Sequence, residues 1–259
     1  MIAALLAIHL SQQTALSPSD FPAGHSHNDY SQKEPLVSAL KSKFRSIEAD
    51  VFPVNNDLWV SHDKKDLTPN NTLVGMYLTP LSKIISENKG SVYGDGKEMI
   101  LLVDIKTDGV KAYETLKTIT KPFRSILSSV ENGNLKVRAI RIILSGARSE
   151  PEVEADNPRF AFLDGRWQEA DKPSMNSLLT PLMSESWQSV FPLKFGKSFT
   201  PEDRTKLRAM VEKVHSKGQI LRFWATPEDP ILWKILAEEK VDLIGTDKHE
   251  LLAEFLQKK

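Results

Sequence analysis

The sequence alternates eight short strand-forming runs with helix-forming segments, and this alternation restricts the fold class more than any other feature. Several runs are continuously apolar, which is typical of strands that are covered on both faces. In chain order the runs are 21–27, 46–52, 99–106, 139–146, 160–165, 181–186, 220–226 and 242–247. We expect an α/β fold of the TIM-type (β/α)8 barrel class, with a doubly wound open sheet as the alternative. No glycine-rich dinucleotide fingerprint follows a run, which favours the barrel.

The segments between the runs carry helical patterns. We expect helices over 34–43, 78–88, 113–130, 201–217, 230–239 and 248–256. The start at Pro201 is the best marked, because Thr200 suits an N-cap and Pro201 suits the first turn. We expect the acidic stretch 149–157 to be a solvated loop. No linker divides the chain, so residues 21–259 are predicted to form a single barrel domain.

The N-terminus is a separate case. Residues 1–10 form an apolar run that is far shorter than the roughly 20 residues needed to span a bilayer, and a polar stretch follows it. This order resembles a secretory signal peptide over 1–17, with an apolar segment that packs on the barrel as the alternative. The signal predicts an exported protein, periplasmic or secreted, with a cytoplasmic location as the alternative and no stable membrane span.

Charge and cysteine content exclude several function classes. Lys and Arg number 34 and so do Asp and Glu, so the formal net charge is zero and nucleic acid is not an expected partner. Cysteine is absent, which excludes a thiol nucleophile, a cysteine-ligated zinc and a disulfide framework.

Ionisable residues gather where the predicted strands end, which is where the catalytic groups of an α/β barrel lie. Buried charge is costly unless it is paired or binds a metal, so a ring of such residues indicates a functional site. In chain order the ring comprises His25, His27, Glu48, Asp50, His62, Asp104, Lys106, Asp164, Arg166, Glu185, Arg222 and Asp247, together with Trp224.

Three of these carboxylates favour a divalent cation. Glu48 and Asp50 are two apart on a strand, so their side chains share a face, and Asp104 ends the next barrel strand. Oxygen ligands suit Mg²⁺ or Ca²⁺. The alternative is a set of salt bridges to Lys106 or Arg222.

Of the six histidines, His9 lies in the apolar N-terminal run, and we expect His215 and His249 to be structural. His25, His27 and His62 are predicted to lie beside the carboxylates. Two imidazoles at a metal-bound phosphoester are suited to act as general acid and general base.

The stretch AGHSHNDYSQKEPLVSALKSKFRSIEADVFPVNNDLWVSHD closely resembles the N-terminal signature of glycerophosphodiester phosphodiesterases. Its HSHNDY form resembles the phospholipase C-like phosphodiesterase branch. Further on, VDIK resembles the third-strand acid and lysine of the family, and FWAT and VDLIGTD resemble its C-terminal strands. The aspartate and lysine of VDIK, together with the tryptophan of FWAT, also resemble the sphingomyelinase D relatives.

The resemblance implies metal-dependent hydrolysis of glycerophosphodiesters or phospholipid-type phosphodiesters, small-molecule or lipid-derived. By this resemblance His25 and His62 form the acid–base pair, although His27 points to the same side and could also line the site. The implied metal ligands are Glu48, Asp50 and Asp104, and the implied phosphate or substrate contacts are Lys106, Arg222, Trp224 and Asn28.

Two alternatives come from other classes. The pair His25 and His27 also resembles the first-strand histidines of amidohydrolases and of PHP-type metal hydrolases. A non-catalytic barrel that binds a phosphoester or a sugar is the second alternative. The sequence leaves open the substrate head group, the choice of cation and the oligomeric state.

Overall fold

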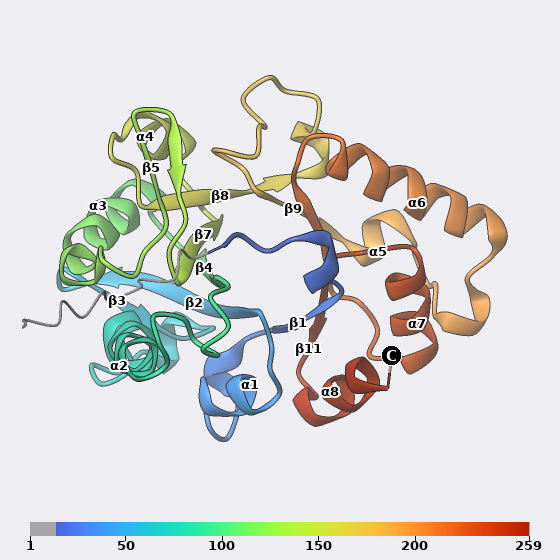
Figure 1. Cartoon of the computed structure of the whole chain (residues 1–259), viewed down its shortest axis with the longest axis horizontal. Helices are drawn as coiled ribbons and strands as arrows, with labels where there is room; N and C mark the ends of the chain where they lie inside the picture. Colours follow the sequence, from blue (N-terminus) through green and yellow to red (C-terminus); the bar gives the residue numbers. More distant parts are fainter. Residues whose placement is uncertain (1–13, 259) are drawn as a thin grey trace, which may run out of the picture.

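The computed structural model describes residues 14–258, and its centre is a closed barrel of eight parallel strands (Figure 1). The barrel strands are β1 (Ala23–Ser26), β2 (Ser46–Val54), β4 (Met99–Ile105), β7 (Ile140–Gly146), β8 (Ala161–Arg166), β9 (Leu182–Ser186), β10 (Ile220–Trp224) and β11 (Leu243–Thr246). β1 pairs with both β2 and β11, which closes the barrel. Each of the eight predicted runs forms a barrel strand, so the expected fold is confirmed.

Helices surround the barrel (Figure 1). They are α1 (Val37–Lys41), α2 (Thr79–Glu87), α3 (Gly109–Ile119), α4 (Glu150–Ala155), α5 (Trp187–Val190), α6 (Pro201–His215), α7 (Pro230–Glu238) and α8 (His249–Gln257). A π-helical segment, η4 (Val74–Leu78), leads into α2. Short 3-10 turns are η1 (Pro18–Asp20), η2 (Asp29–Ser31), η3 (Lys64–Asp66), η5 (Lys121–Phe123), η6 (Trp167–Glu169) and η7 (Gly196–Ser198). α6 begins as expected, because the Thr200 side chain accepts a hydrogen bond from the Asp203 amide.

Two segments differ from the sequence prediction. The helix expected over 113–130 ends at Ile119, and β5 (Ser129–Glu131) pairs antiparallel with β6 (Asn134–Lys136) instead. Asn132 and Gly133 both adopt positive φ, which is the conformation of a tight hairpin turn. The acidic stretch expected to be a loop contains α4, whose first turn places Glu150 and Glu152 at the positive end of the helix.

The core has two layers, one inside the barrel and one between the barrel and the helices. On β2, Ile47, Ala49 and Val51 point outward into the helix-facing layer, so the alternate residues Glu48 and Asp50 point inward. Apolar side chains such as Leu102 and Phe162 fill the lower part of the barrel. Polar side chains line the part of the interior near the C-terminal ends of the strands.

The strand β3 (Asp57–Val60) extends the barrel sheet beyond the closed barrel. It pairs antiparallel with the extended end of β2 and places His62 beside the C-terminal end of the barrel. Among the helices of residues 14–258, none is long and apolar enough to cross a membrane.

Part of the predicted signal segment, residues 1–13, lies outside the described residues. Its last residues pack on the barrel: Thr14 donates its amide hydrogen to Gly96, and the Leu16 amide donates to the Glu98 carboxylate at 3.2 Å. Leu16 also contacts the apolar interior of the barrel.

Candidate active site

Three carboxylates meet at the C-terminal end of the barrel. Asp50 on β2 is in register with Asp104 on β4, and Glu48 lies one layer below on the same face of β2. One oxygen from each of the three lies within 4.8 Å of the others. Glu48 and Asp50 are buried and Asp104 is partly buried. Their convergence follows from parallel pairing, which brings like positions of neighbouring strands side by side.

This cluster has the chemistry of a cation site. Asp50 Oδ1 is buried and has no hydrogen-bond partner among the described residues. Leaving a buried carboxylate oxygen unpartnered is costly, and a hard cation removes that cost. Burial raises the pKa of Asp104, and the charges of Asp50 and Glu48 add to this although Lys106 opposes it. The three residues therefore fit Mg²⁺ or Ca²⁺.

The other oxygen of Asp50 is the centre of a hydrogen-bond network. Asp50 Oδ2 lies 2.7 Å from Lys106 Nζ, 2.7 Å from the Tyr30 hydroxyl and 2.9 Å from His62 Nδ1. Glu48 pairs with Arg222 at 3.0 Å. The salt bridges that were the alternative to a metal are thus present, yet Asp50 Oδ1 has no partner in the part of the chain that the structure describes.

His25 is fully buried and both of its ring nitrogens are occupied. Its Nδ1 lies 2.7 Å from Ser46 Oγ, and its Nε2 lies 2.8 Å from Glu48 Oε2. Burial, assisted by the charge of Arg222, lowers the pKa of His25 to about 4. The ring is thus neutral near pH 7 and holds the Glu48 carboxylate in place.

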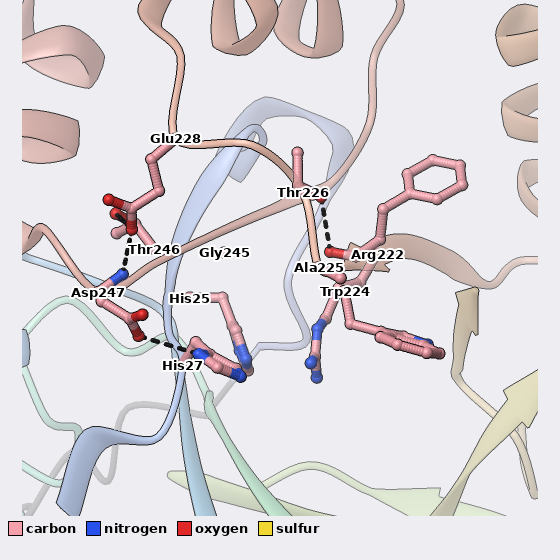
Figure 2. A pocket seen from close by; sticks show the side chains of 11 residues that line it. His25, His27, Arg222, Trp224, Ala225, Thr226, Glu228, Gly245, Thr246 and Asp247 are labelled. Carbon is pink, nitrogen blue, oxygen red and sulfur yellow. Dashed lines mark hydrogen bonds and ion pairs between the residues drawn. The ribbon is translucent and has the colours of Figure 1, made fainter. Parts of the chain in front are cut away.

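His27 differs from His25 in every one of these respects. Its side chain is 39% exposed, and its Nδ1 lies 2.9 Å from Asp247 Oδ1. That hydrogen bond raises the pKa of His27, although burial opposes it. No described residue forms a hydrogen bond to its Nε2. Figure 2 shows the His27 ring beside Asp247, on the wall of the pocket that faces Arg222.

His62 is arranged similarly to His27. Its side chain is 62% exposed, and its Nδ1 is bonded to Asp50. In residues 14–258, no hydrogen bond occupies its Nε2. Two histidines, each oriented by a carboxylate, thus keep one nitrogen available for proton transfer.

The site opens into two connected cavities. The first, which we call the carboxylate lobe, has a volume of about 260 Å³; its lining includes Glu48, His62, Asp104, Lys106, Asp164 and Arg166. The second, which we call the side lobe, has a volume of about 230 Å³; its lining includes Ala225, Thr226, Glu228, Gly245, Thr246 and Asp247 (Figure 2). His27, Arg222 and Trp224 line both lobes and mark their junction.

The remaining predicted contacts also lie here. Arg222 is buried, and its Nε has no partner among the described residues. Trp224 is 45% exposed at the mouth, and Asn28 lines the carboxylate lobe with its backbone at positive φ. Glu34, which belongs to the stretch that resembles the family signature, is exposed and pairs with Lys41 outside the site.

Sequence reasoning did not assign roles to several residues of the site. Tyr30 was recognised only as part of the HSHNDY motif, and Asp247 only as the end of a strand. Their hydrogen-bond partners, Asp50 and His27, were not predicted. Across the carboxylate lobe, Ser145 Oγ and Arg166 Nη1 each lie 2.8 Å from Asp164 Oδ2. The signal for Asp164 and Arg166 was their place at the end of β8.

Other side chains of the HSHNDY motif point away from the barrel interior and form a second hydrogen-bond network. Ser26 Oγ donates to Asp29 at 2.7 Å and lies 2.8 Å from His249 Nε2 on α8. Asp29 accepts further hydrogen bonds from the Leu36 amide and the Tyr77 hydroxyl. This buried network fixes the turn after β1, which carries His27.

Residues 19–164 match the model of the AIM6-like phosphodiesterase domain. The chain belongs to this family. It is 30% identical over 253 residues to the "Altered inheritance of mitochondria protein 6 homolog" of Arthroderma benhamiae, covering 86% of this chain and 80% of that protein. It is 28% identical to "Altered inheritance of mitochondria protein 6" of Eremothecium gossypii, covering 89% and 68%.

Solved structures share the fold. A calcium-dependent phosphoinositol-specific phospholipase C from a Pseudomonas species has a TM-score of 0.58 at 11% identity, covering 88% of each chain. A glycerophosphodiester phosphodiesterase from Parabacteroides distasonis has a TM-score of 0.53 at 14% identity, covering 91% of this chain and 97% of that one. The expected phospholipase C-like phosphodiesterase fold and family are therefore confirmed, rather than the amidohydrolase or PHP alternative.

The expectation of export is wrong. The relatives from Arthroderma and Eremothecium are named for altered inheritance of mitochondria, which ties them to an organelle inside the cell. The apolar N-terminal run was therefore misleading as an indicator of location, because a short apolar segment does not by itself specify secretion.

Proposed function

We propose that this AIM6-like protein is a metal-dependent phosphoric diester hydrolase that acts on glycerophosphodiesters or phospholipid-type phosphodiesters. One observation carries the proposal. Three carboxylates converge, and one Asp50 oxygen has no hydrogen-bond partner among the described residues. Two of the three, Glu48 and Asp104, line a cavity together with His27 and His62. The family and the fold neighbours support the same reaction type.

Each residue of the site has a separate role in this proposed reaction. The Asp247 hydrogen bond keeps a proton on His27 Nδ1, so its Nε2 accepts the proton of the attacking hydroxyl. The attacking oxygen bonds to phosphorus, the bond from phosphorus to the departing alcohol breaks, and His62 donates a proton to the alkoxide. Lys106 and Arg222 bind the non-bridging oxygens, for which guanidinium is well matched.

Glu48, Asp50 and Asp104 would hold the cation. A bound Mg²⁺ or Ca²⁺ supplies positive charge that polarises a phosphoryl oxygen. His25 has a positioning role in this proposal, because its Nε2 holds Glu48 Oε2 at 2.8 Å. This reverses the order of His25 and His27 implied by the family resemblance.

Phosphorus NMR on a panel of phosphodiesters tests the proposal directly. With Mg²⁺ or Ca²⁺ we expect conversion of the diester to a monoester or a cyclic phosphate, and with EDTA we expect none. Equal conversion in EDTA, or an intact panel with both cations, would contradict the proposed function.

The pH dependence should follow His27. Its hydrogen bond to Asp247 raises its pKa, so Asp247→Asn should lower that pKa. Because a general base must be unprotonated, the acidic limb of the kcat/KM profile should move to lower pH in the variant, and kcat should fall. An acidic limb that does not move in Asp247→Asn would show that His27 is not the base.

A further inference from the structure

We propose that the protein has a second ligand site at the N-terminal ends of the barrel strands, which binds a small monocarboxylate with a compact apolar body. The site is a cavity that we call the base pocket, and it shares no lining residue with the carboxylate lobe or the side lobe. The inference goes beyond the proposed function and does not depend on it, because it involves none of the proposed catalytic residues.

The base pocket lies between the barrel and the stretch that leads into β1. Figure 1 shows this stretch crossing the centre of the barrel. The pocket has a volume of about 170 Å³, and a cavity of about 150 Å³ with apolar walls is large enough to bind a benzene ring. Most of the lining is apolar and includes Leu16, Phe21, Ile100, Leu135, Ile143 and Ile220. The pocket therefore has both the size and the walls for a compact apolar group.

The base pocket is far from the proposed active site. Glu98 lines it directly before β4, and Asp104 lies near the other end of the same strand. At about 3.3 Å per residue, the two carboxylates are about 20 Å apart along the strand. A ligand in the base pocket would thus leave both lobes of the active site accessible.

Arg141 supplies the polar contact. It lines the base pocket and is only 8% exposed. Its Nε donates to Glu98 Oε2 at 2.9 Å, whereas its Nη2 is buried and has no hydrogen-bond partner among the described residues. A buried N–H group without an acceptor is costly, and a guanidinium is well matched to carboxylate oxygens. A ligand carboxylate in the pocket would provide the acceptor that Arg141 Nη2 lacks.

Charge favours an anion over a neutral acceptor, because a second buried arginine, Arg159, lies beside the base pocket. Its Nη2 donates at 2.6 Å to the carbonyl oxygen of Leu178, which lines the pocket. Arg141 is paired with Glu98, but Arg159 forms no ion pair within residues 14–258. Further charges at this end of the barrel are joined in pairs, Lys97 with Asp20 and Arg138 with Glu131. One positive charge without a paired carboxylate matches a monoanion.

Calorimetry with benzoate and benzamide tests the site, because these probes have nearly the same shape and differ in charge. We expect one benzoate to bind per chain, about tenfold or more tightly than benzamide. Saturating inorganic phosphate, which the lobes of the active site can admit, should not displace it. No binding of benzoate, equal affinities for the two probes, or displacement by phosphate would each overturn the inference.

The variant Arg141→Lys tests the polar contact. It keeps a positive charge beside Glu98 but removes the guanidinium, so we expect the affinity for benzoate to fall about tenfold or more. Arg138→Lys is the control, because Arg138 lies at the same end of the barrel but does not line the base pocket, and it should bind benzoate as the wild type does. Wild-type affinity in a folded Arg141→Lys protein would contradict the assignment.

A second variant leaves every buried charge in place. Leu178 lines the base pocket and is 40% exposed, so Leu178→Glu adds a negative charge at the mouth with little effect on folding. We expect the affinity for benzoate to fall about threefold or more and that for benzamide to stay the same, since only benzoate is repelled. Leu193→Glu, at an exposed leucine that does not line the pocket, is the control and should change neither affinity. An unchanged affinity for benzoate in Leu178→Glu, or an equal loss for both probes, would overturn the inference.

Discussion

Replacing His27 by alanine should lower kcat by about 10²–10⁴-fold with the fold intact, because its Nε2 is the nitrogen we assign to proton transfer. His27 is partly exposed, and within residues 14–258 its only side-chain hydrogen bond is to Asp247 at the surface, so little stability depends on it. The measurement is kcat on the best diester of the NMR panel, with the melting temperature of each variant recorded beside it.

Two other histidines provide the comparison. His215→Ala removes an imidazole that is also bonded to an aspartate, Asp242 at 2.9 Å, but on the outer helix α6, so kcat should be unchanged. His25→Ala should mainly lower stability, by about 1–3 kcal/mol, because Ser46 and Glu48 lose a buried partner. If His27→Ala kept normal turnover while His25→Ala was inactive and still folded, the roles assigned to the two residues would have to be exchanged.

Asp50→Asn should be the most damaging change at the cluster. It removes one of three cation ligands and weakens the network to Lys106, Tyr30 and His62, so we expect kcat to fall by about 10³-fold or more, since Lewis-acid stabilisation is worth several kcal/mol. Wild-type protein should gain about 2.7 kcal/mol of stability when free Mg²⁺ or Ca²⁺ is at 100 times its Kd. In Asp50→Asn this gain should shrink.

Melting curves in EDTA and in excess cation measure that gain without reference to activity. Asp66→Asn, which changes an exposed carboxylate outside the cluster, is the control and should keep the wild-type response. A wild-type melting temperature that is the same with and without cation would argue against a metal at Glu48, Asp50 and Asp104.

The barrel was predictable because its strands are short apolar runs. The alternation of side chains along a strand also predicted that Glu48 and Asp50 share one face. The hydrogen-bond partners of the inward-facing side chains were not predictable in this way. Alternation puts His25 and His27 on the same side of β1, but it does not say that Ser46 and Glu48 occupy both ring nitrogens of His25 while His27 Nε2 has no hydrogen bond within residues 14–258. That difference depends on the height at which neighbouring strands place their side chains.

Partnerships between distant segments were also beyond the sequence. Tyr30 follows a turn in which Asn28 has positive φ, and only this turn carries its hydroxyl to Asp50. The β5–β6 hairpin was missed because its two strands are only three residues each, too short for alternation to be visible. α4 was missed because acidic residues that stabilise a helix start also occur in solvated loops.

The pairing of β1 with β11 has a consequence for how the protein is made. The three proposed cation ligands lie between residues 48 and 104, whereas His27 depends on Asp247, 220 residues away, and Ser26 depends on His249, 223 residues away. A growing chain therefore contains all three carboxylates long before it contains Asp247 or the strand that closes the barrel. Chains clipped before β11 would lack both the strand that closes the barrel and the carboxylate that orients His27, so we expect them to be inactive.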